Sequence, residues 1–282
     1  MKTILVPVDA TATAENAAKF AAEWGQQYGY DHIVLLNTHY ESVFDYVTMA
    51  EGYAFVDGEN VTSRHKNTEL LLAHLRGIIL AIAPLLKVTG TISRIPLLRS
   101  TIDFIKNDPS VELIILGSDD EGASNDSLVA ANIVGIARAS SVKTLIVPRG
   151  LPYKAIKNVL VPFDIYRTTN LERLSKFRSV LKAEDARLLL LNIDTKESTT
   201  LAADKKKEWE QNLGQYFTDI PYSIYYSSDR DIIKGILSFA QTNNVDLITA
   251  LPGKHSFLYY LVNRSISEGI YKNRYQAVLI LK

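Results

Sequence analysis

Four short segments of this sequence recur later in the same chain at two constant spacings. The first two pairs are 155 residues apart and the last two are 134 apart: residues 4–9 with 159–164, 34–37 with 189–192, 111–114 with 245–248, and 145–147 with 279–281. Constant spacings indicate a duplicated unit rather than chance similarity. The first copy then carries 21 more residues, the difference between 155 and 134.

A cluster of structure-breaking residues separates the two copies. Pro148, Gly150 and Pro152 lie close together in a stretch without apolar periodicity, which is typical of a connection between domains. We therefore predict one domain over residues 1–150 and a second over residues 151–282. The extra length of the first copy falls between about Tyr40 and Pro109.

Each copy alternates short apolar runs with helical patterns. Runs such as residues 4–8 show no polar alternation, which predicts strands buried on both faces of a parallel sheet. Strands joined through helices by right-handed crossovers form an open, doubly wound sheet. The prediction is an α/β fold with two tandem, mainly parallel, five-stranded sheets of Rossmann-like type.

Helix boundaries are readable in the first copy. Thr11 or Thr13 can cap a helix that Gly29 ends, since threonine hydroxyls accept first-turn amides and glycine adopts the left-handed conformation of a helix end. A strong helical pattern covers Thr68–Ala83, and a weaker one includes Asp103–Lys106.

The charge balance excludes partners recognised by bulk charge. Lysine plus arginine and aspartate plus glutamate number 31 each, so neither nucleic acid nor an anionic membrane is predicted as a partner. The chain has no cysteine, which removes disulfides, thiolate metal sites and a cysteine nucleophile. No apolar stretch is long enough to span a bilayer and no signal-peptide pattern is present, so the predicted location is cytoplasmic.

The opening segment, residues 2–9, its alanine-rich helix and the repeat that starts at Lys157 resemble the universal stress protein family. The resemblance covers the whole chain as two units. It implies an adenine-nucleotide α-hydrolase-like fold and pairing through the last strand of each unit. We therefore expect Thr144–Val147 to lie against Val278–Leu281 in a pseudo-twofold arrangement of the first domain on the second. Whether two whole chains form a homodimer is left open.

The resemblance also implies a nucleotide site in each copy. In the family, Gly-x-x-Gly, nine residues and then Gly-Ser or Gly-Thr bring backbone amides to the phosphates of ATP. The first copy matches at Gly117, which Ser118 follows, but Asp120 replaces the second glycine and Ala130-Ala131 replace Gly-Ser. Three consecutive acids from Asp119 onward would crowd a polyphosphate, so this site is predicted to be disabled for ATP unless a metal ion bridges the acids to phosphate.

The second copy departs from the family pattern differently. Leu251 and Lys254 replace the first two glycines, Arg264 replaces the third, and Ser265 keeps the hydroxyl. Together with His255 these side chains either plug the old pocket or form a small-anion site.

Asp9 and Asp164 follow the first strand of each copy, where ligands bind in such sheets. Each is either a capping or turn acid or a carboxylate that faces a ribose or adenine.

The predicted function is a stress-response regulatory or scaffold protein with degenerate nucleotide motifs, no cofactor and an unidentified protein partner. An adenine-nucleotide or small-anion sensor that binds ATP, ADP or AMP is the alternative, and a slow ATP hydrolase is the third. No catalytic residue is predicted, because no nucleophile and base can be assembled. No metal site is predicted, because no two of the five histidines have metal-ligand spacing. The aromatic segment Tyr40–Asn60 is a lid, a partner surface, or a loop packed on its own domain.

Overall fold

The computed structural model describes residues 1–38, 58–119, 128–163, 186–193, 206–211, 213, 217, 220–229, 231–250 and 275–282, with residues 58–64, 130 and 131 as backbone only. The chain divides into two compact units. The first comprises Met1–Gly117 and Ala123–Ser140, and the second comprises Ser118–Gly122 and Ser141–Lys282. Both are α/β, as predicted.

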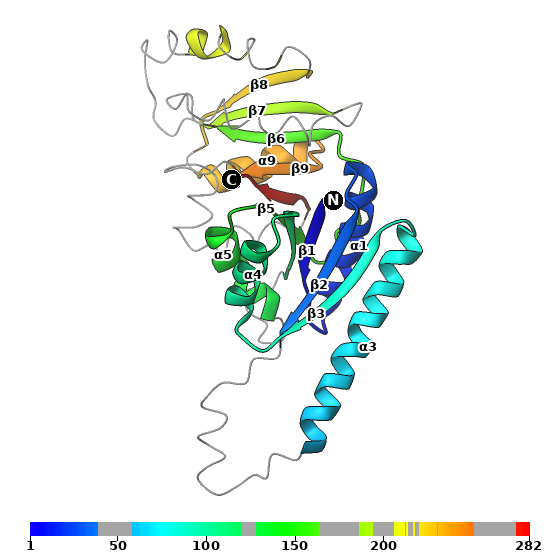
Figure 1. The fold of residues 1–282 in the computed structure, drawn as a ribbon. Coiled ribbons are helices and arrows are strands. Elements are labelled where there is room, and N and C mark those ends of the chain that lie inside the picture. Colours follow the sequence, from blue (N-terminus) through cyan, green and yellow to red (C-terminus); the bar gives the residue numbers. More distant parts are fainter. Residues whose placement is uncertain are drawn as a thin grey trace, which may run out of the picture. The chain divides into compact units, whose positions relative to one another are not determined.

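The first unit is built on a parallel sheet in the order β3-β2-β1-β4 (Figure 1). The strands are β1 (Thr3–Pro7), β2 (His32–Thr38), β3 (Lys87–Ser93) and β4 (Val111–Ser118). Every residue of β1 and β2 is buried, which confirms the prediction of strands covered on both faces. The parallel direction brings the carboxyl ends of the strands to one edge of the sheet.

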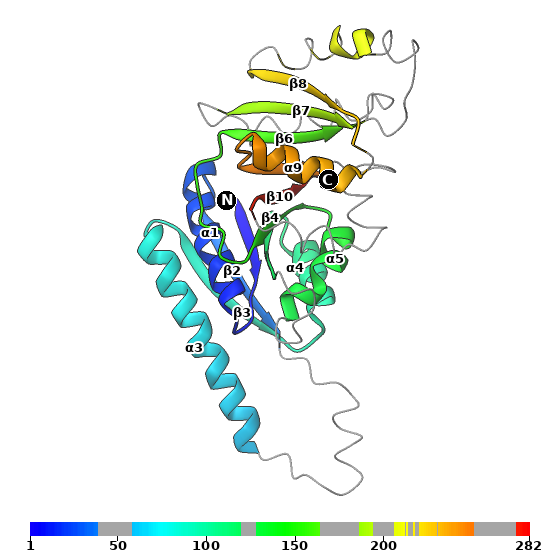
Figure 2. The ribbon, with the colours of Figure 1, turned by 180° about the vertical axis from the view of Figure 1, so that it is seen from behind.

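Two pairs of helices cover this sheet: α1 (Ala12–Tyr28) with α3 (Gly58–Ile82), and α4 (Leu97–Asn107) with α5 (Leu128–Ala139). Helices α1 and α3 pack side by side on one face, and α4 and α5 on the other (Figures 1 and 2). Gly135 of α5 permits close packing here, because a Cβ atom at this position would lie 3.2 Å from Leu98 of α4.

The predicted ends of the first helix are confirmed. Thr11 is the N-cap of α1, and its hydroxyl accepts the Ala14 amide at 3.2 Å. The helix ends at Gly29, whose φ of 64° lies in the left-handed region that glycine adopts without strain.

The predicted start of the helix at Thr68 is wrong, because α3 begins ten residues earlier at Gly58. Residues 58–67 contain a single aliphatic residue, Val61, and therefore show no apolar periodicity that would predict a helix. Once the turns around Leu72, Leu75 and Ile79 are anchored in the core, helix extension adds one hydrogen bond per residue without a new nucleus. The weaker helix around Asp103–Lys106 is confirmed as part of α4.

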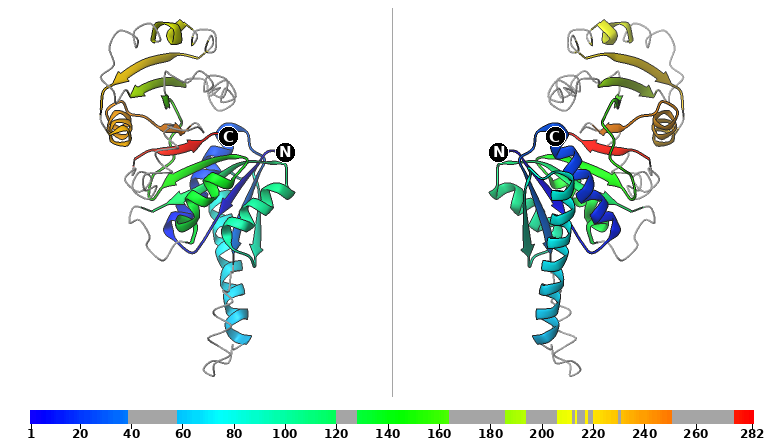
Figure 3. Two further views of the ribbon diagram at one scale, coloured as in Figure 1. Left: turned by 90° about the vertical axis from the view of Figure 1, so that its left-hand side faces the viewer. Right: turned by 90° about the vertical axis from the view of Figure 1, so that its right-hand side faces the viewer.

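The second unit contains β5 (Lys143–Pro148), β6 (Asn158–Phe163), β7 (Arg187–Ile193), β8 (Tyr222–Ser227), α9 (Ile232–Thr242), β9 (Leu247–Ala250) and β10 (Ala277–Ile280). Its strand order is β5-β10-β9-β6-β7-β8 (Figures 1 and 2). Figure 3 shows the ribbon from two further sides. The run β8-β7-β6-β9 repeats the order β3-β2-β1-β4 of the first unit, with all three pairings parallel. The sequence repeat is therefore also a repeat of topology.

The pairing predicted between the last strands of the two copies is confirmed. Strand β10 pairs with β5 in antiparallel register, with Leu279 opposite Leu145 and Ile280 opposite Thr144. Because of this pairing, β5 belongs to the second compact unit, although it is the last strand of the first sequence copy. The boundary of the copies at residue 150 stays a prediction.

A chain of polar side chains crosses the amino-terminal edge of the first sheet. Asp108 accepts the hydroxyl of Ser110 at 2.6 Å, and that hydroxyl lies 2.8 Å from Thr3 Oγ1. The ring of the buried His32 lies 3.5 Å from Thr3 Oγ1 through Nδ1 and 2.8 Å from Thr89 Oγ1 through Nε2. Burial lowers the pKa of His32, as does nearby Lys87, while Asp108 opposes the shift.

We predict that His32 makes the first unit less stable in mild acid. Because its folded pKa lies below its unfolded value, the unfolded chain takes up the proton first as pH falls through about 6.5. The free energy of unfolding should then decrease by at most about 1.4 kcal/mol per pH unit from this group. Urea unfolding of wild type and His32→Gln between neutral and mildly acidic pH measures it. Parallel pH profiles of the two proteins would contradict the prediction.

Candidate functional site

The candidate site of the first unit lies where β1, β2 and β4 end. Asp9 follows β1 and is half-buried, and both of its carboxylate oxygens accept hydrogen bonds. Thr11 Oγ1 donates to Oδ1 at 2.5 Å, and the Val129 amide donates to Oδ2 at 3.1 Å. Asp9 therefore joins the start of α1 to the start of α5.

The amide that Asp9 accepts belongs to the first turn of α5. First-turn amides have no acceptor within their helix and carry the positive end of the helix dipole, so they attract anions. Residues 130 and 131, which replace the Gly-Ser expected from the resemblance, lie in the same turn. The chain's own carboxylate thus lies where a phosphate would approach α5.

Gly117 has a packing role at the end of β4. A Cβ atom at this position would lie 2.7 Å from both the carbonyl oxygen and Cγ2 of Thr13, in the first turn of α1. Because one of these atoms belongs to the backbone, it cannot move aside cheaply. Gly117 therefore permits β4 and α1 to approach closely, and this role requires no ligand.

Two buried polar atoms at the end of β2 have no hydrogen-bond partner among the described residues. They are Asn37 Oδ1 and Thr38 Oγ1, on residues that are 7% and 8% exposed. The Asn37 amide nitrogen donates to the Val8 carbonyl at 2.8 Å, which fixes its side chain beside the end of β1. A donor in this region could therefore bond to Asn37 Oδ1, and an acceptor or a donor to the Thr38 hydroxyl.

Ser118 and Asp119 continue β4 and belong to the second unit by their contacts. Ser118 is buried, and its hydroxyl donates to the Val147 carbonyl at 3.4 Å. Asp119 is 8% exposed and lies 3.5 Å from the guanidinium of Arg149. One of the three acids expected to repel a polyphosphate is therefore partly neutralised by an arginine of the same unit.

The corresponding edge of the second unit is more aromatic. Phe163, which replaces Val8, stacks on the buried Trp209 with ring centroids 3.9 Å apart and planes 2° apart. Asn192 recurs at the position of Asn37 and is buried. The other predicted site residues of this copy lie outside the described residues: Asp164, Leu251, Lys254, His255, Arg264 and Ser265. In the first copy, Asp120 and most of the aromatic segment 40–60 also lie outside them.

The described residues hold no group of three or more histidine, aspartate or glutamate side chains arranged to bind a metal ion. None of the helices in this part of the chain combines the length and apolar character that a membrane span requires. The chemistry available at the first site is therefore hydrogen bonding from Asn37, Thr38 and the first turn of α5, next to one fixed carboxylate.

Comparison with solved structures identifies the fold. A universal stress protein from Archaeoglobus fulgidus superimposes with a TM-score of 0.67 at 15% identity, covering 99% of this chain and 96% of that one. This chain has a universal stress protein fold. A functionally unknown protein from Pseudomonas aeruginosa PAO1 matches with a TM-score of 0.59 at 15% identity, covering 100% and 92% of the two chains. A candidate universal stress protein from P. aeruginosa UCBPP-PA14 matches with a TM-score of 0.58 at 14% identity, covering 100% of this chain and 93% of that one.

No family model matches the sequence, and neither does any curated protein. The universal stress protein fold is thus retained here at an identity where the sequence comparisons find no relative. This agrees with the resemblance inferred from the opening strand and its repeat.

Sequence reasoning missed three features of the first site. It treated Thr11 only as a helix cap, whereas the Thr11 hydroxyl also fixes Asp9. It assigned no role to Asn37 or Thr38. The recurrence of Leu-Asn at residues 36–37 and 191–192 was a usable signal for Asn37, because a polar residue kept at the end of a buried strand needs a partner.

We predict that Gly117→Ala destabilises the protein by about 1–3 kcal/mol, the usual cost of overpacking. Gly77→Ala is the matched control, because a Cβ atom at Gly77 in α3 would meet nothing within 4 Å and should stabilise the helix by up to about 1 kcal/mol. Chemical denaturation of the two variants measures both changes. Equal stabilities would show that the contact with Thr13 relaxes freely.

Proposed function

We propose that this chain is a stress-response regulatory or scaffold protein whose first nucleotide site does not take up ATP. The observation that carries the proposal is the hydrogen bond from the Val129 amide to Asp9, which places the protein's own carboxylate at the N-terminus of α5. The universal stress protein fold supports the stress-response context, and the altered glycine pattern of the first copy supports the loss of phosphate binding.

Electrostatics give the size of the effect. A phosphate about 5 Å from the Asp9 carboxylate would be disfavoured by about 3 kcal/mol at an effective dielectric of about 20. The missing hydroxyl at residue 131 removes a further hydrogen bond of about 1 kcal/mol. Together these terms weaken binding by about a thousandfold, since 1.4 kcal/mol is a factor of ten.

We predict that millimolar ATP with magnesium leaves the free energy of unfolding of the wild type unchanged. Restoring the family pattern with Asp120→Gly, Ala130→Gly and Ala131→Ser, combined with Asp9→Asn, should create binding, and ligand at about 100 times its dissociation constant then stabilises by about 2.7 kcal/mol. Thermal-shift titration and calorimetry of both proteins test this.

The same titration can contradict the proposed function. Stabilisation of the wild type by ATP would overturn the proposal. If only the combined variant responds, the altered motif and the Asp9 carboxylate block the site together. An Asp9→Asn variant that alone gains binding would assign the effect to the Asp9 carboxylate.

A second candidate function is recognition of an adenine nucleoside without its phosphates. The buried Asn37 Oδ1 and Thr38 Oγ1 favour it, since a buried polar group without a partner costs about 1–3 kcal/mol. A nucleoside has amine and hydroxyl groups for both atoms, and it carries no charge for Asp9 to repel.

We predict that Thr38→Val leaves the ligand-free protein as stable as the wild type or more stable, because the lost hydroxyl has no described partner. The same change should weaken adenosine binding about tenfold, and Thr91→Val should not. Calorimetry with adenosine and urea unfolding of each variant measure both effects. A loss of stability in ligand-free Thr38→Val would instead assign the hydroxyl a partner within the chain.

A further inference from the structure

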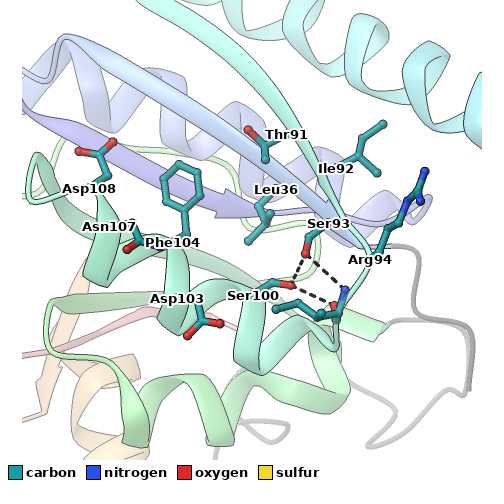
Figure 4. A pocket seen from close by; sticks show the side chains of 11 residues that line it. Leu36, Thr91, Ile92, Ser93, Arg94, Ser100, Asp103, Phe104, Asn107 and Asp108 are labelled. Atoms are coloured by element: carbon teal, nitrogen blue, oxygen red, sulfur yellow. Dashed lines mark hydrogen bonds between the residues drawn. The ribbon is translucent and has the colours of Figure 1, made fainter.

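An open groove of about 570 Å³ lies between β3 and α4 in the first unit (Figure 4). Leu36 of β2 lies at its base. Ser100, Asp103, Phe104 and Asn107 line it from α4, and this spacing of three and four residues places them on one face of the helix. Thr91 and Ser93 line it from β3, and Asp108 lies at one end.

The opposite end of the groove is held in shape by hydroxyl contacts. Ser100 donates to Ser93 Oγ at 2.7 Å and lies 3.0 Å from the Ile95 carbonyl (Figure 4). Ser100 is 4% exposed, so these contacts fix the turn between β3 and α4. The wall is therefore preformed and need not be ordered by a ligand.

Strand β3 is the terminal strand of its sheet, and no described strand pairs with its outer edge. All seven of its residues pair with β2 without a bulge, and it contains no proline. The Lys87 amide donates to the backbone carbonyl of Asp31, next to β2. By alternation, the backbone groups of Val88, Gly90 and Ile92 therefore face outward. Such an edge can accept another extended chain.

Charges of opposite sign stand at the two ends of the groove. Arg94 is exposed, and no described residue forms an ion pair with it. Beside it, α4 begins after Pro96 without a side-chain cap, so its first amides add positive potential. At the other end the Ser110 hydrogen bonds lower the pKa of Asp108 and keep it ionised. Asp103 lies between, 3.6 Å from Arg99.

We propose that an extended peptide adds to the outer edge of β3 and places alternate side chains over the groove, with its free C-terminal carboxylate at Arg94 and a basic side chain toward Asp108. The peptide then runs parallel to β3. Helix α4 is 11 residues long, or roughly 16 Å, which matches about five extended residues. The proposal rests on the scaffold role above and specifies the chemistry of the partner.

The test uses the full chain and a fluorescein-labelled hexapeptide, Lys-Thr-Val-Thr-Val-Val, with a free carboxylate. Fluorescence anisotropy should show saturable binding. Amidation of the peptide C-terminus should weaken it about fivefold or more, because a charge-assisted contact is lost. Arg94→Gln should weaken binding of the acid by a similar factor and leave binding of the amide unchanged. Methylation of alternate peptide amides should abolish binding.

Arg76→Gln is the matched control, since Arg76 is exposed on α3, on the other face of the sheet, and should leave the affinity unchanged. Equal affinity for acid and amide, or an Arg94→Gln variant that binds as well as the wild type, would overturn the proposal. So would concentration-dependent dimerisation that Ile92→Pro abolishes, because the edge would then be covered by a second copy of the chain.

These outcomes are separate from the fate of the proposed function. If the peptide does not bind and ATP still has no effect, the peptide site at β3 is disproved, and the scaffold role would then depend on another surface. Binding of ATP by the wild type removes the scaffold role, whatever the peptide does.

Discussion

The position of β1 inside the first sheet, between β2 and β4, is the constraint on which the candidate site depends. Every residue of β1 is buried, and parallel neighbours pair with both of its edges. A shift of one residue would move every side chain of β1 to the opposite face of the sheet, where different helices pack against it. The turn after β1 therefore has a fixed place beside the ends of β2 and β4. Asp9, which lies in that turn, can reach the first turn of α5, 120 residues later in the chain.

Asp9 and Gly117 give the first site an organisation that needs no ligand. The Asp9 carboxylate accepts the Val129 amide in the first turn of α5. Gly117 permits the close contact between β4 and the first turn of α1. The sequence resemblance predicted a nucleotide-binding role for both residues, and each has a structural role in the fold. Asn37 and Thr38 differ, since their oxygens are buried without a described partner. The site thus combines a helix N-terminus that is already paired with Asp9 and two buried oxygens at the end of β2 that have no described partner.

The two copies differ in charge at the N-termini of two corresponding helices, α9 and α4. In the second unit, Asp231 caps α9 by accepting the Lys234 amide at 3.1 Å. In the first unit, the corresponding helix α4 follows Pro96, and Arg94 stands beside it. The aromatic stack of Phe163 on Trp209 has no counterpart at Val8. Since the copies share one topology, these local substitutions are what distinguish their surfaces. The open end of α4 belongs to the first copy alone among the described residues.

The sequence by itself determined the duplicated topology. Short apolar runs without alternation indicate buried strands, and Thr11 and Gly29 mark helix ends through local backbone chemistry. The constant spacings predict which strands correspond. It also predicted the pairing of the last strands through the family resemblance. Only the tertiary structure decided which groups meet. The extension of α3 to Gly58, the contact between Asp9 and Val129, and the groove beside β3 depend on packing between segments distant in sequence. Periodicity reports the face that a residue occupies, and it carries no information about the partner on that face.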